Sequence, residues 1–146
     1  MSTLKVDTYL TRGGASEIAI DKLKGVTAAG SMLVVGEGGT VTTNLQQGLA
    51  KAWVNFDGEA AGAAARDSFN VGSMTDNSTG NHTITTSSAF ANDDFSTPIG
   101  EKQDSVVTIT HCSPASTSTV TVISFNSGGT NDDFSVVSVV MLGDLA

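Results

Sequence analysis

TVTVISFNSGGTNDDFSVVSVVML, residues 119–142, is the stretch that decides the fold class. Residues 119–125 alternate polar and apolar side chains with a period of two, the pattern of a strand with one buried face. Residues 127–130, Ser-Gly-Gly-Thr, predict a turn. Residues 134–142 are nearly continuous in apolar side chains, so we expect a strand with both faces covered by a second sheet, a neighbouring subunit or both.

The composition extends this prediction to the whole chain. Of 146 residues, 19 are Thr and 17 are Ser, whereas aromatic residues make up 5%. Thr and Val favour strands, and the 16 Gly with Asn and Asp favour turns. Strands spaced about 8–15 residues apart are typical of sandwiches and jelly rolls. We therefore expect an all-β fold, a β-sandwich or jelly roll, with an extended N-terminal β arm and one short linker helix.

The remaining elements divide the chain in two. The linker helix is expected over residues 43–52, about two to three turns long, with Thr43 or Asn44 as its cap. Residues 1–50 would form an arm or attachment segment that includes this helix, and residues 51–146 the β-sandwich domain. Besides the two strands above, we expect strands at residues 4–10, 17–23, 31–35, 82–85 and 105–110.

The charge follows the same division. Residues 1–50 are neutral, and residues 51–146 carry the whole net charge of −8. An acidic surface repels phosphates, so we expect no nucleic-acid partner for this part, whereas the neutral segment suits docking on another protein. No apolar run reaches 18 residues and no apolar h-region follows Met1, so neither membrane insertion nor a signal peptide is expected.

Two patterns suggest a metal site, and a simpler interpretation is preferred for both. Asn92-Asp93-Asp94-Phe95-Ser96 recurs as Asn131-Asp132-Asp133-Phe134-Ser135. We expect two Asx turns that deliver an inward Phe, and the alternative is a Ca²⁺ site, for which the spacing of an EF-hand is missing. His82 and His111 are expected to be solvated or hydrogen-bonded histidines and not joint metal ligands. We predict no metal and no other cofactor.

The candidates for catalysis are equally weak. Cys112 follows His111, but neighbours on a strand point to opposite faces, so Cys112 is expected to be a buried or half-buried filler. Gly36-Glu37-Gly38-Gly39 lacks the ending of a phosphate loop and predicts a flexible loop. The single cysteine also excludes an intramolecular disulfide and a zinc site built on several cysteines.

Glycan chemistry is the last alternative. Two of the three acids Asp57, Glu59 and Asp67 could serve as a carboxylate pair for glycoside hydrolysis, although a solvated acidic surface is the simpler interpretation. Trp53 near Phe56 could stack on a sugar, but its position and the period of the strand favour the core. We predict that the protein is not an enzyme and has no catalytic residue.

One block connects the chain to a known family. Lys51-Ala52-Trp53-Val54-Asn55-Phe56-Asp57-Gly58 resembles the K-A-W-V-N-F-(N/D)-G block of tail fibre and related virion proteins of tailed bacteriophages, especially those of marine bacteria and cyanobacteria. Residues 1–8, 66–71 and 75–83 resemble the opening, the R-x-S-x-N-V segment and the S-I-T-D-N-G-T-G-D-Y-T turn of that family. The family's N-G-T-G is Asn77-Ser78-Thr79-Gly80 here, and residues 12–47 have no counterpart.

The resemblance implies a structural virion protein, most often trimeric, that is made in the host cytoplasm. The expected role is that of a short tail fibre or tail-tip subunit in assembly and host adsorption, with residues 1–50 docking on other virion proteins. A host surface glycan is a further expected partner. The alternatives are a head decoration (cement) protein that stabilises the capsid, and a carbohydrate-binding module or small glycan hydrolase that uses Trp53 and the acids.

Overall fold

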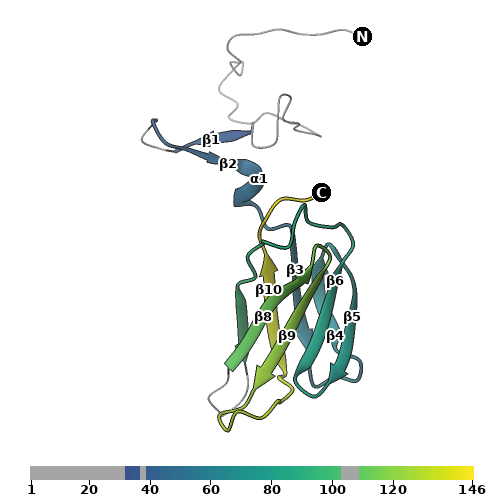
Figure 1. The fold of residues 1–146 in the computed structure, drawn as a ribbon. Helices are drawn as coiled ribbons and strands as arrows, with labels where there is room; N and C mark the ends of the chain where they lie inside the picture. The colour runs from purple at the N-terminus through teal and green to yellow at the C-terminus, as the bar shows by residue number, and fades with distance from the viewer. Residues whose placement is uncertain (1–31, 37–38, 103–108) are drawn as a thin grey trace, which may run out of the picture.

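The computed structural model describes residues 32–36, 39–102 and 109–146. In this part of the chain, two four-stranded antiparallel sheets pack face to face (Figure 1). The first sheet has the order β4-β3-β10-β7 and the second has the order β5-β6-β9-β8. The strands are β3 (Ala52–Asp57), β4 (Ala64–Phe69), β5 (Val71–Ser78), β6 (Asn81–Thr86), β7 (Ile99–Lys102), β8 (Ile109–Ser116), β9 (Thr119–Phe125) and β10 (Val136–Met141). The all-β sandwich expected from the sequence is confirmed.

The core lies between the sheets and is built from alternate residues of the central strands. Val120 and Val122 of β9 are buried, as the period of two predicts. β10 buries Val137, Val139 and Met141, but its other side chains are only partly covered. The second sheet therefore covers one face of β10, and within the described residues the other face remains partly open.

The order of the strands combines local hairpins with long-range pairings, which are β3–β10, β7–β10 and β6–β9. β3–β4, β5–β6 and β8–β9 are pairs of consecutive strands, whereas β3 also pairs with β10 near the end of the chain. Asn70 alone joins β4 to β5 and thus carries the chain from one sheet to the other, with φ at 56°. Asn tolerates this left-handed conformation, and its amide donates to the Lys51 carbonyl over 3.0 Å while its Oδ1 accepts from the Ser88 N–H.

The repeated Asn-Asp-Asp-Phe-Ser segment delivers two inward aromatic rings, as expected. Phe95 and Phe134 are both buried. The first copy contains the expected Asx bond, since the Asp94 N–H donates to Asn92 Oδ1 over 3.1 Å. In the second copy the Oδ1 of Asp133 accepts from the N–H of Gly80 over 2.6 Å, so this turn is tied to the β5–β6 hairpin.

The N-terminal part that the structure describes is a small hairpin followed by one helical turn. β1 (Leu33–Val35) pairs with β2 (Thr42–Asn44), and Figure 1 shows them outside the sandwich, at the end where the C-terminus lies. Asn44 caps α1 (Leu45–Gly48), as predicted, by accepting from the N–H groups of Gln46 and Gln47. The predicted length of two to three turns is wrong. No residue of α1 is buried, so no packing stabilises further turns, and the chain is extended again at Leu49.

The other expected strands have different outcomes. The strand predicted at residues 82–85 lies within β6, and the one predicted at 31–35 corresponds to β1. Of the strand predicted at 105–110, residues 109 and 110 begin β8 and the others lie outside the described residues. The strands predicted at 4–10 and 17–23 lie outside them as well.

Candidate functional site on the outer face of the first sheet

The outer face of the first sheet carries exposed aromatic and polar side chains in neighbouring rows. Ala52, Val54 and Phe56 of β3 point into the core, so Trp53 and the other alternate residues of this strand point outward. The prediction that Trp53 belongs to the core is therefore wrong, because Trp53 is half-buried on this face. We call the outward side of β4, β3, β10 and β7 the aromatic face.

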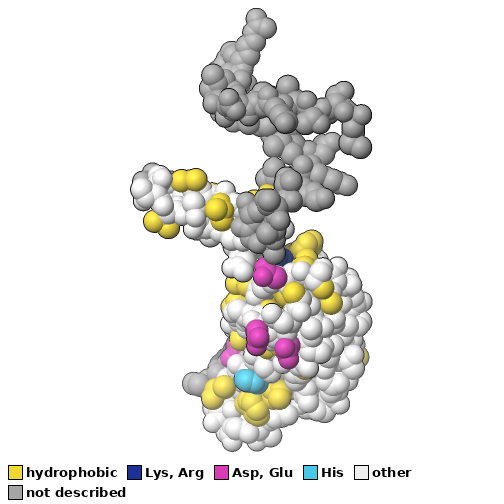
Figure 2. All heavy atoms as spheres, turned by 45° about the horizontal axis from the view of Figure 1, so that its top comes forward, with side chains coloured by type: hydrophobic (Ala, Val, Ile, Leu, Met, Phe, Trp, Pro, Cys, Tyr) yellow, Lys and Arg dark blue, Asp and Glu magenta, His cyan; other side chains and the backbone are white. Residues whose placement is uncertain are grey.

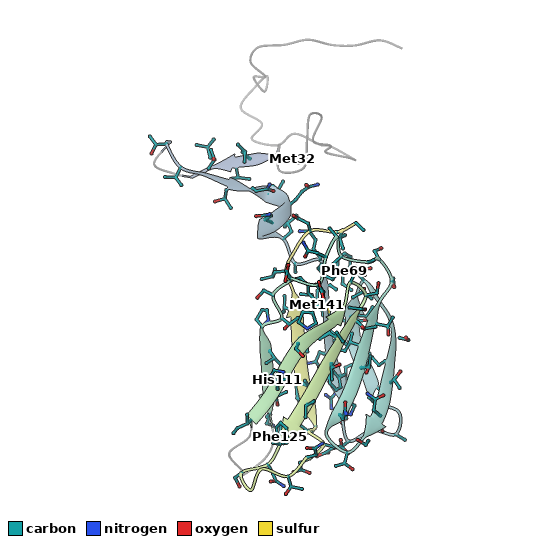
Figure 3. All side chains as sticks on the ribbon, in the orientation of Figure 1. Met32, Phe69, His111, Phe125 and Met141 are labelled. Atoms are coloured by element: carbon teal, nitrogen blue, oxygen red, sulfur yellow. The ribbon has the colours of Figure 1, made fainter. Side chains whose placement is uncertain are left out.

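The first row of the aromatic face is apolar. Trp53 lies directly between Phe69 of β4 and Val140 of β10 in the strand register. Directly opposite residues of antiparallel strands point to the same side, so the three side chains are neighbours. Phe69 is 55% exposed and lies at the end of the sandwich nearest α1 (Figure 3). This row presents aromatic surface to solvent.

The second row is polar. Asn55 lies between Asp67 of β4 and Ser138 of β10, and its amide donates to Ser138 Oγ over 2.6 Å. Gly100 of β7 is opposite Ser138, and a Cβ placed there would meet no atom within 4 Å. The row therefore offers an amide, a carboxylate and a hydroxyl beside open space.

The third row contains the ion pair between Asp57 and Arg66. Arg66 Nη2 lies 2.6 Å from Asp57 Oδ2, and Arg66 Nη1 donates to the Phe56 carbonyl over 3.1 Å. The Glu59 N–H donates to the other carboxylate oxygen of Asp57. Asp57 thus faces a guanidinium and a backbone amide, whereas Glu59 and Asp67 are exposed, which agrees with a solvated acidic surface.

The outer face of the second sheet is different in kind. Two rows of hydroxyl side chains cross its four strands, and no aromatic residue stands in these rows. In the strand register the rows are Thr75, Thr83, Thr121 and Ser113, and Ser73, Thr85, Thr119 and Ser116. We call this side the hydroxyl face. It presents hydroxyl groups without stacking surface in these rows.

His82 lies in the core, contrary to the prediction of a solvated or hydrogen-bonded ring. It is 1% exposed, and its ring meets Phe56 edge-on with centroids 5.3 Å apart. Neither ring nitrogen has a hydrogen-bond partner among the described residues, and Nε2 lies 3.8 Å from Asp133 Oδ1. His82 is paired in register with Val122, which points inward. His111 is paired with Ile123, the next residue of β9, which points outward. The two histidines therefore belong to opposite faces of the sheet and share no site.

Cys112 is the half-buried filler that the sequence predicted. It packs against the core, while the adjacent His111 is exposed on the other side of β8. Burial raises the pKa of the Cys112 thiol, and the Thr97 side chain partly opposes this shift. A nucleophile needs the thiolate, so this cysteine is neither activated by His111 nor inclined to ionise.

Alkylation of Cys112 is expected to be at least tenfold slower in the folded protein than in urea at pH 8. Folding raises the pKa of the Cys112 thiol, so the thiol ionises at a lower pH in the unfolded chain. Ionisation of this group therefore lowers the stability of the fold above the pKa of the unfolded state. Iodoacetamide labelling followed by mass spectrometry measures the alkylation rate of Cys112 in the folded protein and in urea. Equal rates in the two states would contradict the burial of the thiol.

The remaining candidates do not form a reactive centre. Gly36 and Gly39 close the turn between β1 and β2, and the Gly39 N–H donates to the Gly36 carbonyl over 2.9 Å. Residues 37 and 38 lie outside the described part, and the turn leads into β2 and not directly into a helix, as a phosphate loop would require. In the described ranges, no three His, Cys, Asp or Glu side chains are grouped so that they could hold a metal ion.

Cavities among the described residues offer no reactive lining. One, of about 230 Å³, lies between the edge strands β4 and β5 and is lined mostly by small residues such as Gly62, Ala65 and Ser73. Another, of about 270 Å³, lies beside α1 and includes Lys51 and Asp144 in its lining. Neither lining contains a histidine or a cysteine. The aromatic face therefore remains the strongest candidate site.

Comparison with known proteins adds no relative. The chain matches no protein-family model, no curated protein and no solved structure. Among the described residues, no helix is long and apolar enough to cross a membrane. The resemblance to virion proteins accordingly stays a prediction.

Sequence reasoning found Trp53 and the acids but missed Phe69, Asn55 and Ser138 as their neighbours. The signal for Trp53 was available, since Trp53 and Phe56 are three residues apart on one strand and must point to opposite faces. The pairing of Asn55 with Ser138 had no local signal, because it depends on β3 meeting β10.

Proposed function

We propose that this chain is a structural virion protein of a tailed bacteriophage, a short tail fibre or tail-tip subunit that acts in assembly and host adsorption. The proposal combines the resemblance of residues 1–8, 51–58, 66–71 and 75–83 with the form of the molecule, an acidic sandwich that carries a hairpin with exposed apolar side chains outside it. The chain would act by binding and not by catalysis. Within the described residues, the cysteine and the histidine next to it lie on opposite faces.

The hairpin is the observation that carries this proposal. Its large apolar side chains Leu33, Val34, Val35 and Val41 are all at least half exposed, and they appear as yellow groups outside the sandwich in Figure 2. A two-stranded hairpin is marginally stable in water, and exposed apolar strands are typical of surfaces that become covered in an assembly. Residues 32–50 contain one charged residue, Glu37, so repulsion between copies is much weaker for this segment than for the acidic sandwich.

The same hairpin supports a trimer. Leu33 and Val35 lie on one face of β1 and Val34 on the other, so apolar side chains occupy both faces. A closed ring of three copies requires each copy to present two different surfaces, one to each neighbour. We therefore propose a homotrimer that is held at its hairpin end and docks on other virion proteins through residues 1–50.

Placing the protein on the particle tests the function. Immunogold labelling of intact particles with an antibody against residues 51–146 is expected to label the tail end. Label over the head would contradict the tail role and make the chain a decoration protein, for which the projecting β1–β2 hairpin could add to a capsid sheet. Absence of label from particles that infect normally would contradict both roles.

Exchanging Leu33 and Val35 for glutamate is expected to convert the trimer into a monomer, because the added carboxylates repel each other across the interface. Size-exclusion chromatography with light scattering at micromolar concentration measures the mass of the full chain. The matched control is Ile109→Glu, since Ile109 is 63% exposed but lies on β8, away from the hairpin. A monomeric wild-type chain, or a control that dissociates equally, would contradict this interface.

A further inference from the structure

We propose that the aromatic face binds a neutral glycan through Trp53, Phe69, Asn55 and Asp67. This inference rests on the proposed role in adsorption, which it deepens by naming the ligand class and the residues that contact it. Its support is the chemistry of two neighbouring rows of the aromatic face. One row supplies a surface for stacking, and the other supplies hydrogen-bonding groups.

The apolar row supplies the stacking surface. One side of a pyranose ring is lined by C–H groups, and such a surface packs on the flat ring of an aromatic residue. Phe69 is 55% exposed and is next to the half-buried Trp53 in register. The two rings come from directly opposite positions of antiparallel strands, so they lie side by side along one edge of the face.

The polar row supplies directional contacts at the adjacent level of the sheet. Each hydroxyl group of a sugar donates one hydrogen bond and can accept others, so a binding site needs both acceptors and donors beside it. Asn55 and Asp67 are directly opposite each other, two residues along their strands from Trp53 and Phe69. The bond from Asn55 Nδ2 to Ser138 Oγ holds the amide in place, so its carbonyl oxygen is available to hydroxyl donors. Asp67 Oδ1 accepts from the Ser68 N–H over 2.8 Å, which holds this carboxylate and leaves Oδ2 for a hydroxyl donor. A Cβ at Gly100 would meet no atom within 4 Å, so the face is unobstructed at this position.

Charge selects among glycans. Arg66 is bound to Asp57, whereas Asp67 forms no ion pair among the described residues. Lys102 lies on the same side, but on β7 and therefore three strands away from Asp67 on β4. Residues 51–146 carry a net −8. A glycan rich in phosphate, sulfate, sialic acid or uronic acid is repelled by such a surface, whereas a neutral or amino sugar is not. The ligand class is therefore a neutral hexose or amino-sugar glycan.

A second copy of the chain is the main rival occupant. The apolar row alone would suit a subunit interface, but a partner that covers it would bring two acidic sandwiches together and bury Asp67 near the contact. The proposed trimer contacts lie on the hairpin instead. The two rows of the hydroxyl face contain no aromatic residue, so we expect no sugar stacking there, and substitutions on this face serve as controls within the same domain.

The test is a glycan array probed with the full-length protein, containing neutral, amino and acidic glycans. Retention of neutral or amino glycans is expected, followed by titration of the best of them with the fluorescence of Trp53, the single tryptophan of the chain. Phe69→Ala and Asp67→Asn are each expected to weaken binding by about tenfold, as the loss of one stacking or charge-assisted contact would. Ile109→Ala on β8 and Thr121→Ala on the hydroxyl face are the matched controls and should bind as the wild type does.

Three outcomes would overturn the proposal: no glycan retained, retention of acidic glycans alone, or equal weakening by the control variants. Loss of a larger assembly in Phe69→Ala would also overturn it, since the face would then be a subunit interface. The experiments distinguish failure of the proposed tail role from failure of the proposed glycan site. Label over the head with intact glycan binding refutes the tail role, and label at the tail with an empty array refutes the glycan site.

Discussion

Replacing Gly80 by alanine is expected to destabilise the fold by about 3 kcal/mol or more. Gly80 has φ at +66°, and a Cβ there would lie 2.6 Å from the Asp132 nitrogen and 2.6 Å from the Ser124 carbonyl oxygen. Both are backbone atoms, so neither moves without disturbing β9 or the loop to β10. The substitution would also displace the Gly80 N–H from Asp133 Oδ1. Urea unfolding followed by circular dichroism measures the change.

Gly62→Ala is the matched control for backbone crowding. Gly62 has φ at +80°, but a Cβ there would meet no atom within 4 Å, so the substitution adds conformational strain alone. We expect a loss of about 1–2 kcal/mol for this control. Equal losses at Gly80 and Gly62 would show that the approach of the β5–β6 hairpin to the 126–135 loop is not tight.

Replacing Phe134 by alanine is expected to cost about 3–5 kcal/mol of unfolding free energy. Phe134 is 0% exposed and lies two residues before β10, where its ring belongs to the core between the sheets. The truncation removes buried apolar area and leaves a cavity, because the surrounding strands are held by their hydrogen-bond register. A lower urea midpoint at an unchanged slope is the expected signature.

Phe69→Ala is the control for Phe134→Ala, because it removes the same ring from an exposed position and leaves the packing of the core unchanged. Phe69 is 55% exposed on the edge strand β4, so its truncation is expected to cost about 1 kcal/mol or less. A Phe134 variant as stable as the Phe69 variant would contradict the place of Phe134 in the core. The same Phe69 variant serves the glycan experiment, so its near-native stability also validates that measurement.

Strand character was visible locally, and for a physical reason. The period of two in residues 119–125 arises because successive side chains of a strand point to opposite sides, and β9 has this burial pattern. The inward Phe95 and Phe134 were likewise predicted from a repeated turn sequence. The Asn44 cap was predicted because its bond spans only two or three residues.

The errors concern properties that depend on distant parts of the chain. The helix after Asn44 is one turn long because no other element packs on it, which its own residues do not show. His82 is buried because Phe56 and the turn before β10 enclose it. The core prediction for Trp53 rests on position and period, but the alternation of β3 buries Ala52, Val54 and Phe56 and therefore places Trp53 outside.

The sequence by itself determined the β class of this protein, its turns and the acidic character of its last two-thirds, because these follow from side-chain period, backbone preference and composition. The tertiary structure alone decided which strands meet. β3 lies between β4 and β10, and only this arrangement places Phe69, Trp53 and Val140 in one row and Asp67, Asn55 and Ser138 in the next. Strand pairing is decided by the burial of whole sheet faces, to which every strand contributes, so no local stretch of sequence contains it.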